Sequence, residues 1–240
     1  MGETAVKERN GAMSGRHDES PINPLPPIVV ALALVILGIE LIFQAGARGF
    51  AGGQDAVGWR LEAMREYAFS GVVLEWMIDT GRWPLEHVKR FVTYPFIHVS
   101  FTHTLMVLVF LLALGKMVGE VFGTFAVLAV FFLSAIVGAL AFGLLTGEDA
   151  PLVGGYPAVY GLIGSYTFML WVSLAGTGNT QLRAFQLIGF LMGVQLIFGL
   201  LFGTNKNWVA DIFGFGTGFF LSFLLVPGAL ARLRDRLRQR

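Results

Sequence analysis

The sequence predicts an all-α polytopic membrane protein. Of its 240 residues, 55% are hydrophobic and only 14% are charged, which is too apolar for an ordinary soluble domain. A bilayer core about 30 Å thick needs roughly 20 mostly apolar helical residues to cross it. Enough such stretches are present to predict six membrane-spanning helices. They cover residues 28–45, 94–118, 122–145, 156–175, 185–202 and 208–226.

The chain divides into one membrane domain and two short tails. Residues 1–27 are rich in charge and proline and are predicted to be a disordered tail, residues 28–227 form the membrane domain, and residues 228–240 form a basic tail. The first apolar stretch starts late and no clear cleavage site follows it, so a signal peptide is not expected. Because Lys and Arg gather in both tails, the positive-inside rule predicts that both termini are cytoplasmic.

The connection from 46 to 93 is the one long loop. Leu61, Met64 and Ala68 recur at helical spacing among charged residues, and Trp59 and Trp76 are suited to the headgroup level. This pattern predicts an interfacial structure on the membrane surface between the first two spans.

The composition also excludes several kinds of site and partner. The chain has no cysteine, so disulfides and thiolate metal ligands are ruled out. A net charge of +1 gives no support for nucleic-acid binding. The sequence has no phosphate-cradling loop and no convincing set of metal ligands, so no cofactor and no metal are expected. The surrounding partners are expected to be membrane lipids.

Ionisable groups inside a span are costly and are therefore the first candidates for function. Glu40 and Glu120 lie near the ends of their spans, where they are expected to reach water by snorkelling. His98 and His103 are five residues apart, about 140° around a helix, so they would not form a zinc pair. Each histidine is either hydrogen-bonded between helices or functional. Asp211 in the sixth span has no such simple explanation.

The fourth span opens with a glycine-rich turn. Gly154 and Gly155 precede Tyr156 and Pro157, and proline is favoured in the first turn of a helix. Glycines at such a buried helix start let the backbone approach other groups closely. We therefore expect a shaped cavity at the outer end of this span.

The sixth span carries a small-residue motif. Gly214 and Gly218 share one helix face at four-residue spacing, directly after Asp211. This spacing indicates that another helix packs tightly there.

Together these segments resemble the rhomboid family of intramembrane serine peptidases, from about residue 90 to the end. The stretch from Arg90 to His98 resembles the one that follows the family's loop-one Trp-Arg motif, and His103 falls at the second histidine, which helps to hold the oxyanion. The fourth span resembles Gly-x-Ser-Gly followed by an apolar pair and a tyrosine, here Tyr160. The sixth resembles Ala-His-x-x-Gly-x-x-x-Gly. The resemblance implies a six-helix rhomboid-like bundle.

The sequence departs from the family at the positions of the catalytic residues. Aligned without gaps, Tyr156 takes the place of the nucleophilic serine, Pro157 that of the next glycine, and Asp211 that of the general-base histidine. Val107 replaces the asparagine that assists the oxyanion histidine, and Lys89 replaces the loop-one tryptophan. The resemblance therefore implies that no catalytic residue is in place and that proteolysis is lost.

Two other serines, Ser165 and Ser100, are poor replacements for the nucleophile. Ser165 lies about 13 Å deeper than Tyr156 at helical rise, and Ser100 has no evident base. We expect instead that the Tyr156 hydroxyl donates a hydrogen bond to the Asp211 carboxylate, joining the fourth and sixth spans.

Three functional hypotheses follow. The first is a rhomboid-like pseudoprotease that binds transmembrane segments of client proteins without cutting them. The second is a diverged rhomboid intramembrane serine endopeptidase in which another hydroxyl acts. The third is a small transporter or channel that uses Asp211, His98 and His103 as a polar path. The compact form suggests a bacterial cytoplasmic membrane, while the clients and the oligomeric state stay open.

Overall fold

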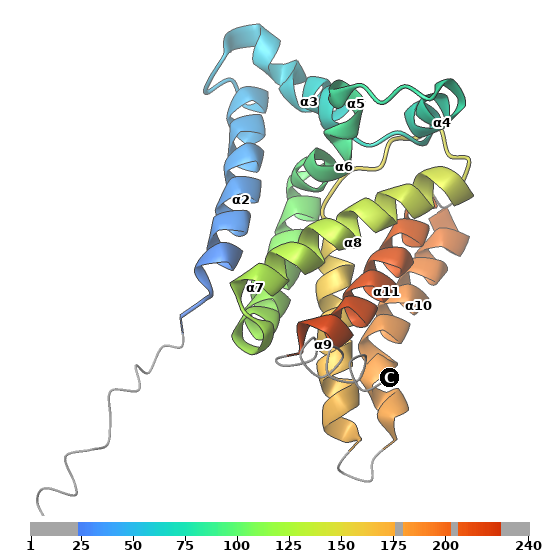
Figure 1. Cartoon of the computed structure of the whole chain (residues 1–240). Helices are drawn as coiled ribbons and strands as arrows, with labels where there is room; N and C mark the ends of the chain where they lie inside the picture. Colours follow the sequence, from blue (N-terminus) through green and yellow to red (C-terminus); the bar gives the residue numbers. More distant parts are fainter. Residues whose placement is uncertain (1–23, 176–179, 203–205, 227–240) are drawn as a thin grey trace, which may run out of the picture.

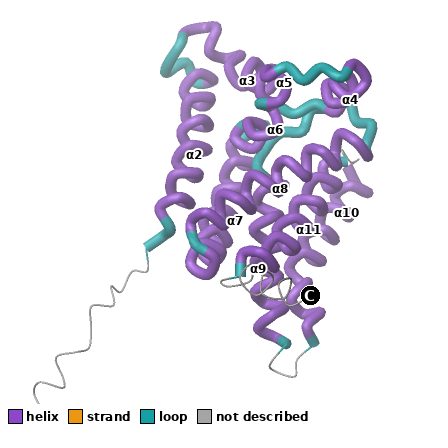
Figure 2. Tube along the Cα trace, in the orientation of Figure 1, coloured by secondary structure: helices purple, strands orange, loops and turns teal. Residues whose placement is uncertain are grey.

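The computed structural model describes residues 24–175, 180–202 and 206–226, and in these ranges the chain is built of helices (Figures 1 and 2). The only β-pairing within them is one isolated bridge. The predicted tails lie outside the described residues, apart from residues 24–27 at the end of the first. The all-α class is confirmed.

Five of the described helices are long and apolar enough to cross a membrane. They are α2 (Pro27–Ala47), α7 (Phe101–Phe122), α8 (Thr124–Leu145), α9 (Tyr156–Leu174) and α11 (Asn207–Leu225). A further helix, α10 (Gln186–Phe202), follows the short 3-10 helix η3 (Gln181–Phe185) and has only 17 residues. The chain is thus a membrane protein, and its sixth span stays a prediction.

The second span begins seven residues later than predicted. Residues 94–96 form only a short 3-10 turn, η2 (Tyr94–Phe96), and Ile97 is extended. Helix α7 starts after Ser100, whose Oγ accepts a hydrogen bond from the backbone N–H of His103 at 3.2 Å and so caps the helix. His98 therefore lies in a non-helical link before the span.

Helix α9 is the central element of the bundle. It packs against α7, α8 and α11, whereas α2 lies at the side and contacts mainly α7 (Figure 1). The start of α2 and the end of α11 lie at the same end of the bundle, opposite α3, α4 and α5.

The long connection forms several short elements across the other end of the bundle. They are η1 (Gly53–Gly58), α3 (Trp59–Tyr67), α4 (Gly71–Thr80), α5 (Leu85–Val88) and α6 (Arg90–Thr93). Phe69 exchanges two backbone hydrogen bonds with Leu152, at 3.1 and 2.8 Å. The Tyr94 hydroxyl donates to the carbonyl of Ala135 at 2.8 Å. These bonds tie the interfacial segment to the α8–α9 link and to α8.

Candidate functional site

His98 connects the segment before α7 to the start of α9. Its side chain is 1% exposed, and its Nε2 accepts a hydrogen bond from the backbone N–H of Gly155 at 3.2 Å. An imidazole nitrogen that accepts carries no proton, so the ring is neutral with its proton on Nδ1. His98 therefore serves as a fixed acceptor at the turn that opens α9.

The two histidine rings meet, although a continuous helix through both would have separated them. The rings of His98 and His103 pack edge to face with centroids 5.0 Å apart. His103 in turn stacks on Tyr156, with centroids 4.7 Å apart and an interplanar angle of 20°. The prediction that the histidines point to different faces was wrong, because His98 is not in the helix.

The glycine turn before α9 fits closely around these rings. Gly154 has a φ of +95°, and a Cβ there would lie 2.6 Å from the His103 Nε2. A Cβ on Gly155 would lie 2.9 Å from the Cγ1 of Val107, whose side chain is fully buried. A larger residue at 154 would displace His103, and one at 155 would press on Val107 and on the carbonyl of Pro95.

Asp211 lies in the second turn of α11 and is 3% exposed. Its Oδ2 accepts a hydrogen bond from the Gln195 side chain of α10 at 2.9 Å. No hydrogen bond joins Tyr156 to Asp211 within the described part of the chain, so the predicted pairing was wrong. Gln195 was not predicted from the sequence, although a polar amide in the middle of an apolar stretch is a signal that could have identified it.

Backbone contact between α9 and α11 holds the site together. A Cβ on Gly218 would overlap the carbonyl oxygen of Gly161, and one on Gly214 would overlap that of Pro157. The Ser165 hydroxyl donates to the carbonyl of Gly218 at 3.1 Å. The glycines of the sixth span thus bring α11 against the first turns of α9, where Tyr156 lies.

Glu40 was expected to reach water, and this was wrong. It is 1% exposed, and its carboxylate accepts hydrogen bonds from Arg60, Gln44 and Thr104. Arg60 reaches both carboxylate oxygens, at 2.9 and 2.7 Å, and donates a third bond to the carbonyl of His98 at 2.6 Å. A buried carboxylate is stable only with such partners. We call Glu40, Arg60 and Thr104 the latch.

Arg90, Tyr160 and Glu120 are the remaining predicted positions. Arg90 donates to the carbonyl of Ala68 at 3.3 Å and so holds α6 to the end of α3. Tyr160 is 4% exposed and its ring packs near that of Tyr156. Glu120 is partly exposed and pairs with Lys116 one turn away.

Comparison with known proteins agrees with this architecture. The family model of the Rhomboid domain matches residues 85–228, which is more than half of the chain. The chain belongs to the rhomboid family.

Two rhomboid relatives are similar over more than half of this chain. The "Putative rhomboid protease YdcA" of Bacillus subtilis (strain 168) is 31% identical over 155 residues, covering 62% of this chain and 70% of that protein. "Rhomboid-like protease 3" of Toxoplasma gondii is 32% identical over 132 residues, covering 54% of this chain and 48% of that protein. This chain therefore spans less than half of the second relative. The rhomboid model begins at residue 85, so Glu40 and Arg60 lie outside it.

Proposed function

We propose that this rhomboid is a pseudoprotease that binds transmembrane segments of client proteins without cleaving them. The observation that carries the proposal is the contact between Tyr156 and His103. At the positions where the resemblance places nucleophile and oxyanion histidine, two rings are stacked face to face. Amide hydrolysis needs an exposed nucleophile beside a base, with donors opposite for the oxyanion.

The base position supports the same conclusion. The Asp211 carboxylate is engaged by Gln195, and no hydroxyl of the described residues donates to it. A phenol such as that of Tyr156 also titrates near pH 10 and is a poor nucleophile at neutral pH. In a serine-peptidase template the loss of nucleophile or base alone costs on the order of 10⁶ in turnover.

The two alternative serines already have structural roles. Ser100 caps α7, and Ser165 bonds across to α11. The second candidate, a diverged rhomboid serine endopeptidase, is favoured by the names of both relatives. Under that candidate one of these serines must become reactive.

A labelling experiment separates the two candidates. The purified protein is treated with a fluorophosphonate probe and, separately, incubated with a generic rhomboid substrate. We expect no labelling above that of heat-denatured protein, and no cleavage. Labelling that disappears in Ser100→Ala or Ser165→Ala would instead establish the peptidase.

The binding half of the proposal needs its own measurement. A donor-labelled transmembrane segment of a rhomboid substrate is reconstituted with the acceptor-labelled protein, and energy transfer is compared with that of a polyleucine segment. We expect stronger transfer with the substrate segment and no proteolysis. Equal transfer with both segments would contradict client binding.

We further propose that the protein resides in a bacterial cytoplasmic membrane with both tails in the cytoplasm. Because the chain has no cysteine, single cysteines report topology without background. In intact cells an impermeant maleimide should label Asp149→Cys, in the α8–α9 link, but not Phe125→Cys, at the start of α8. Phe125→Cys should be labelled only after permeabilisation. The reverse pattern would place the tails outside.

A further inference from the structure

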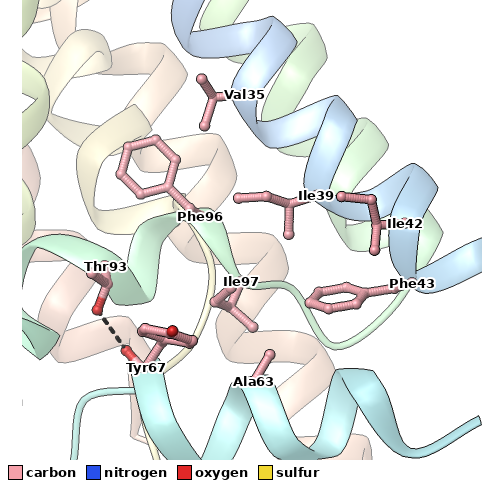
Figure 3. Close-up of a pocket in the computed structure, with 9 residues that line it drawn as sticks. All are labelled: Val35, Ile39, Ile42, Phe43, Ala63, Tyr67, Thr93, Phe96 and Ile97. Atoms are coloured by element: carbon pink, nitrogen blue, oxygen red, sulfur yellow. Dashed lines mark hydrogen bonds between the residues drawn. The ribbon is translucent and has the colours of Figure 1, made fainter. Parts of the chain in front are cut away.

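A pocket of about 410 Å³ lies between α2, α3 and the segment before α7 (Figure 3). Helix α2 supplies one wall, including Ile39 and Phe43, and Ala63 of α3 supplies the opposite wall. Phe96 and Ile97 form the floor on the link before α7. The pocket falls within the size range of small-molecule sites, about 300–1,000 Å³.

The lining is almost entirely apolar. Of the nine lining residues only Tyr67 and Thr93 have hydroxyls. The Thr93 hydroxyl is used within the protein, bonding the Tyr67 carbonyl at 3.0 Å and the Lys89 carbonyl at 3.2 Å. Water in such a site would lack the two to four polar partners that it needs. The occupant must therefore be apolar.

The volume of the pocket distinguishes between two kinds of apolar occupant, a partner helix and a slender flexible chain. One turn of helix with its side chains, about 10 Å wide and 5.4 Å long, occupies roughly 420 Å³, so a partner helix would fill the pocket with a single turn. A membrane span has several turns and would lie across the mouth. A slender flexible chain can enter along its length.

The pocket also borders the lipid-facing side of α2. Val35 and Ile42 line it and are themselves 51% and 56% exposed. Leu34 and Leu41 beside them are also exposed apolar residues, at 62% and 54%. In a membrane this surface is in contact with lipid tails, which can pass from it into the pocket.

We propose that this pocket binds one acyl chain of a membrane phospholipid. The chain would fill the space beside Phe43, which lies under the Arg60 guanidinium at 5.0 Å from its ring centroid. An occupied pocket would therefore support the latch from its apolar side. Because seven of the nine lining residues are purely apolar and no lining residue is charged, we expect binding to depend on the chain and not on the headgroup.

Photo-crosslinking tests the proposal directly. The protein is reconstituted with phosphatidylcholine or phosphatidylglycerol that carries a diazirine on one acyl chain, and crosslinked peptides are mapped by mass spectrometry. We expect crosslinks concentrated at residues 35–43 and 93–97, equally for both headgroups. Crosslinks spread evenly over all lipid-facing helices, or confined to one headgroup, would overturn the proposal.

A pocket-filling variant supplies the control. Ala63→Trp places a large ring in the cavity and should lower crosslinking at 93–97 several-fold. Leu34→Trp puts the same ring on the exposed side of α2 and should leave the crosslinking at 93–97 unchanged. Equal crosslinking in the two variants would contradict the site. If Ala63→Trp does not fold, the crosslink map of the unsubstituted protein still tests the proposal.

Discussion

Replacing Arg60 by alanine is expected to lower the melting temperature of the detergent-purified protein by on the order of 10 °C. The substitution removes two charge-assisted hydrogen bonds from Glu40, a carboxylate that is 1% exposed. Leaving one partner of a buried ion pair alone costs about 3–5 kcal/mol. It also frees the carbonyl of His98, whose ring holds the turn before α9.

The chain offers a matched control for this loss. Lys89 and Glu66 form a pair of similar length, 2.8 Å, but their side chains are 32% and 57% exposed. Lys89→Ala should cost about 0–1 kcal/mol, as exposed pairs do. A double variant, Glu40→Leu with Arg60→Leu, should recover much of the loss because apolar residues can replace a buried pair. If Arg60→Ala lowers the melting temperature no more than Lys89→Ala does, the latch does not stabilise the fold.

Gly218→Ala is expected to be the most damaging single-methyl substitution in the bundle. The added Cβ would overlap the carbonyl oxygen of Gly161, which is backbone and cannot rotate away. Overpacking usually costs about 1–3 kcal/mol, and here the two helices must separate to relieve it. We expect the free energy of unfolding to fall by an amount at or above the top of that range. Thermal unfolding, or the yield of monodisperse protein, measures the effect.

Gly216→Ala is the control for Gly218→Ala. It lies in the same helix, and a Cβ there meets no atom within 4 Å. Alanine is the better helix former by up to about 1 kcal/mol, so stability should be unchanged or higher. Similar losses in both variants would show that the close approach of α9 and α11 is not the cause.

Most of the fold could be predicted from the sequence because the bilayer imposes length and apolarity on each span. The start at Tyr156 matched the prediction, since Pro157 can occupy only the first turn of a helix. The start of α7 did not, because apolar residues continue through Tyr94 and Phe96 although the backbone is not α-helical there. Hydropathy does not distinguish an apolar link from an apolar helix.

The polar contacts were less predictable, because they join residues far apart in the chain. Thr104 and Glu40 are 64 positions apart, and Arg60 comes from a segment whose helices are short. The position of Glu40 near a span end fitted a solvated carboxylate equally well. Asp211 was identified as unusual, but its partner depended on α10, whose position against α11 is a matter of packing. Three-dimensional arrangement, rather than residue type, decided both cases.

The latch has a consequence for biogenesis. Glu40 leaves the ribosome 20 residues before Arg60 and 64 before Thr104. At about 5–20 residues per second these intervals are roughly 1–4 s and 3–13 s. During that time the first helix holds an acidic side chain that has Gln44 beside it but lacks Arg60 and Thr104, at an insertion penalty of up to about 3 kcal/mol. The first helix should therefore settle in its final position only after the second has entered the bilayer.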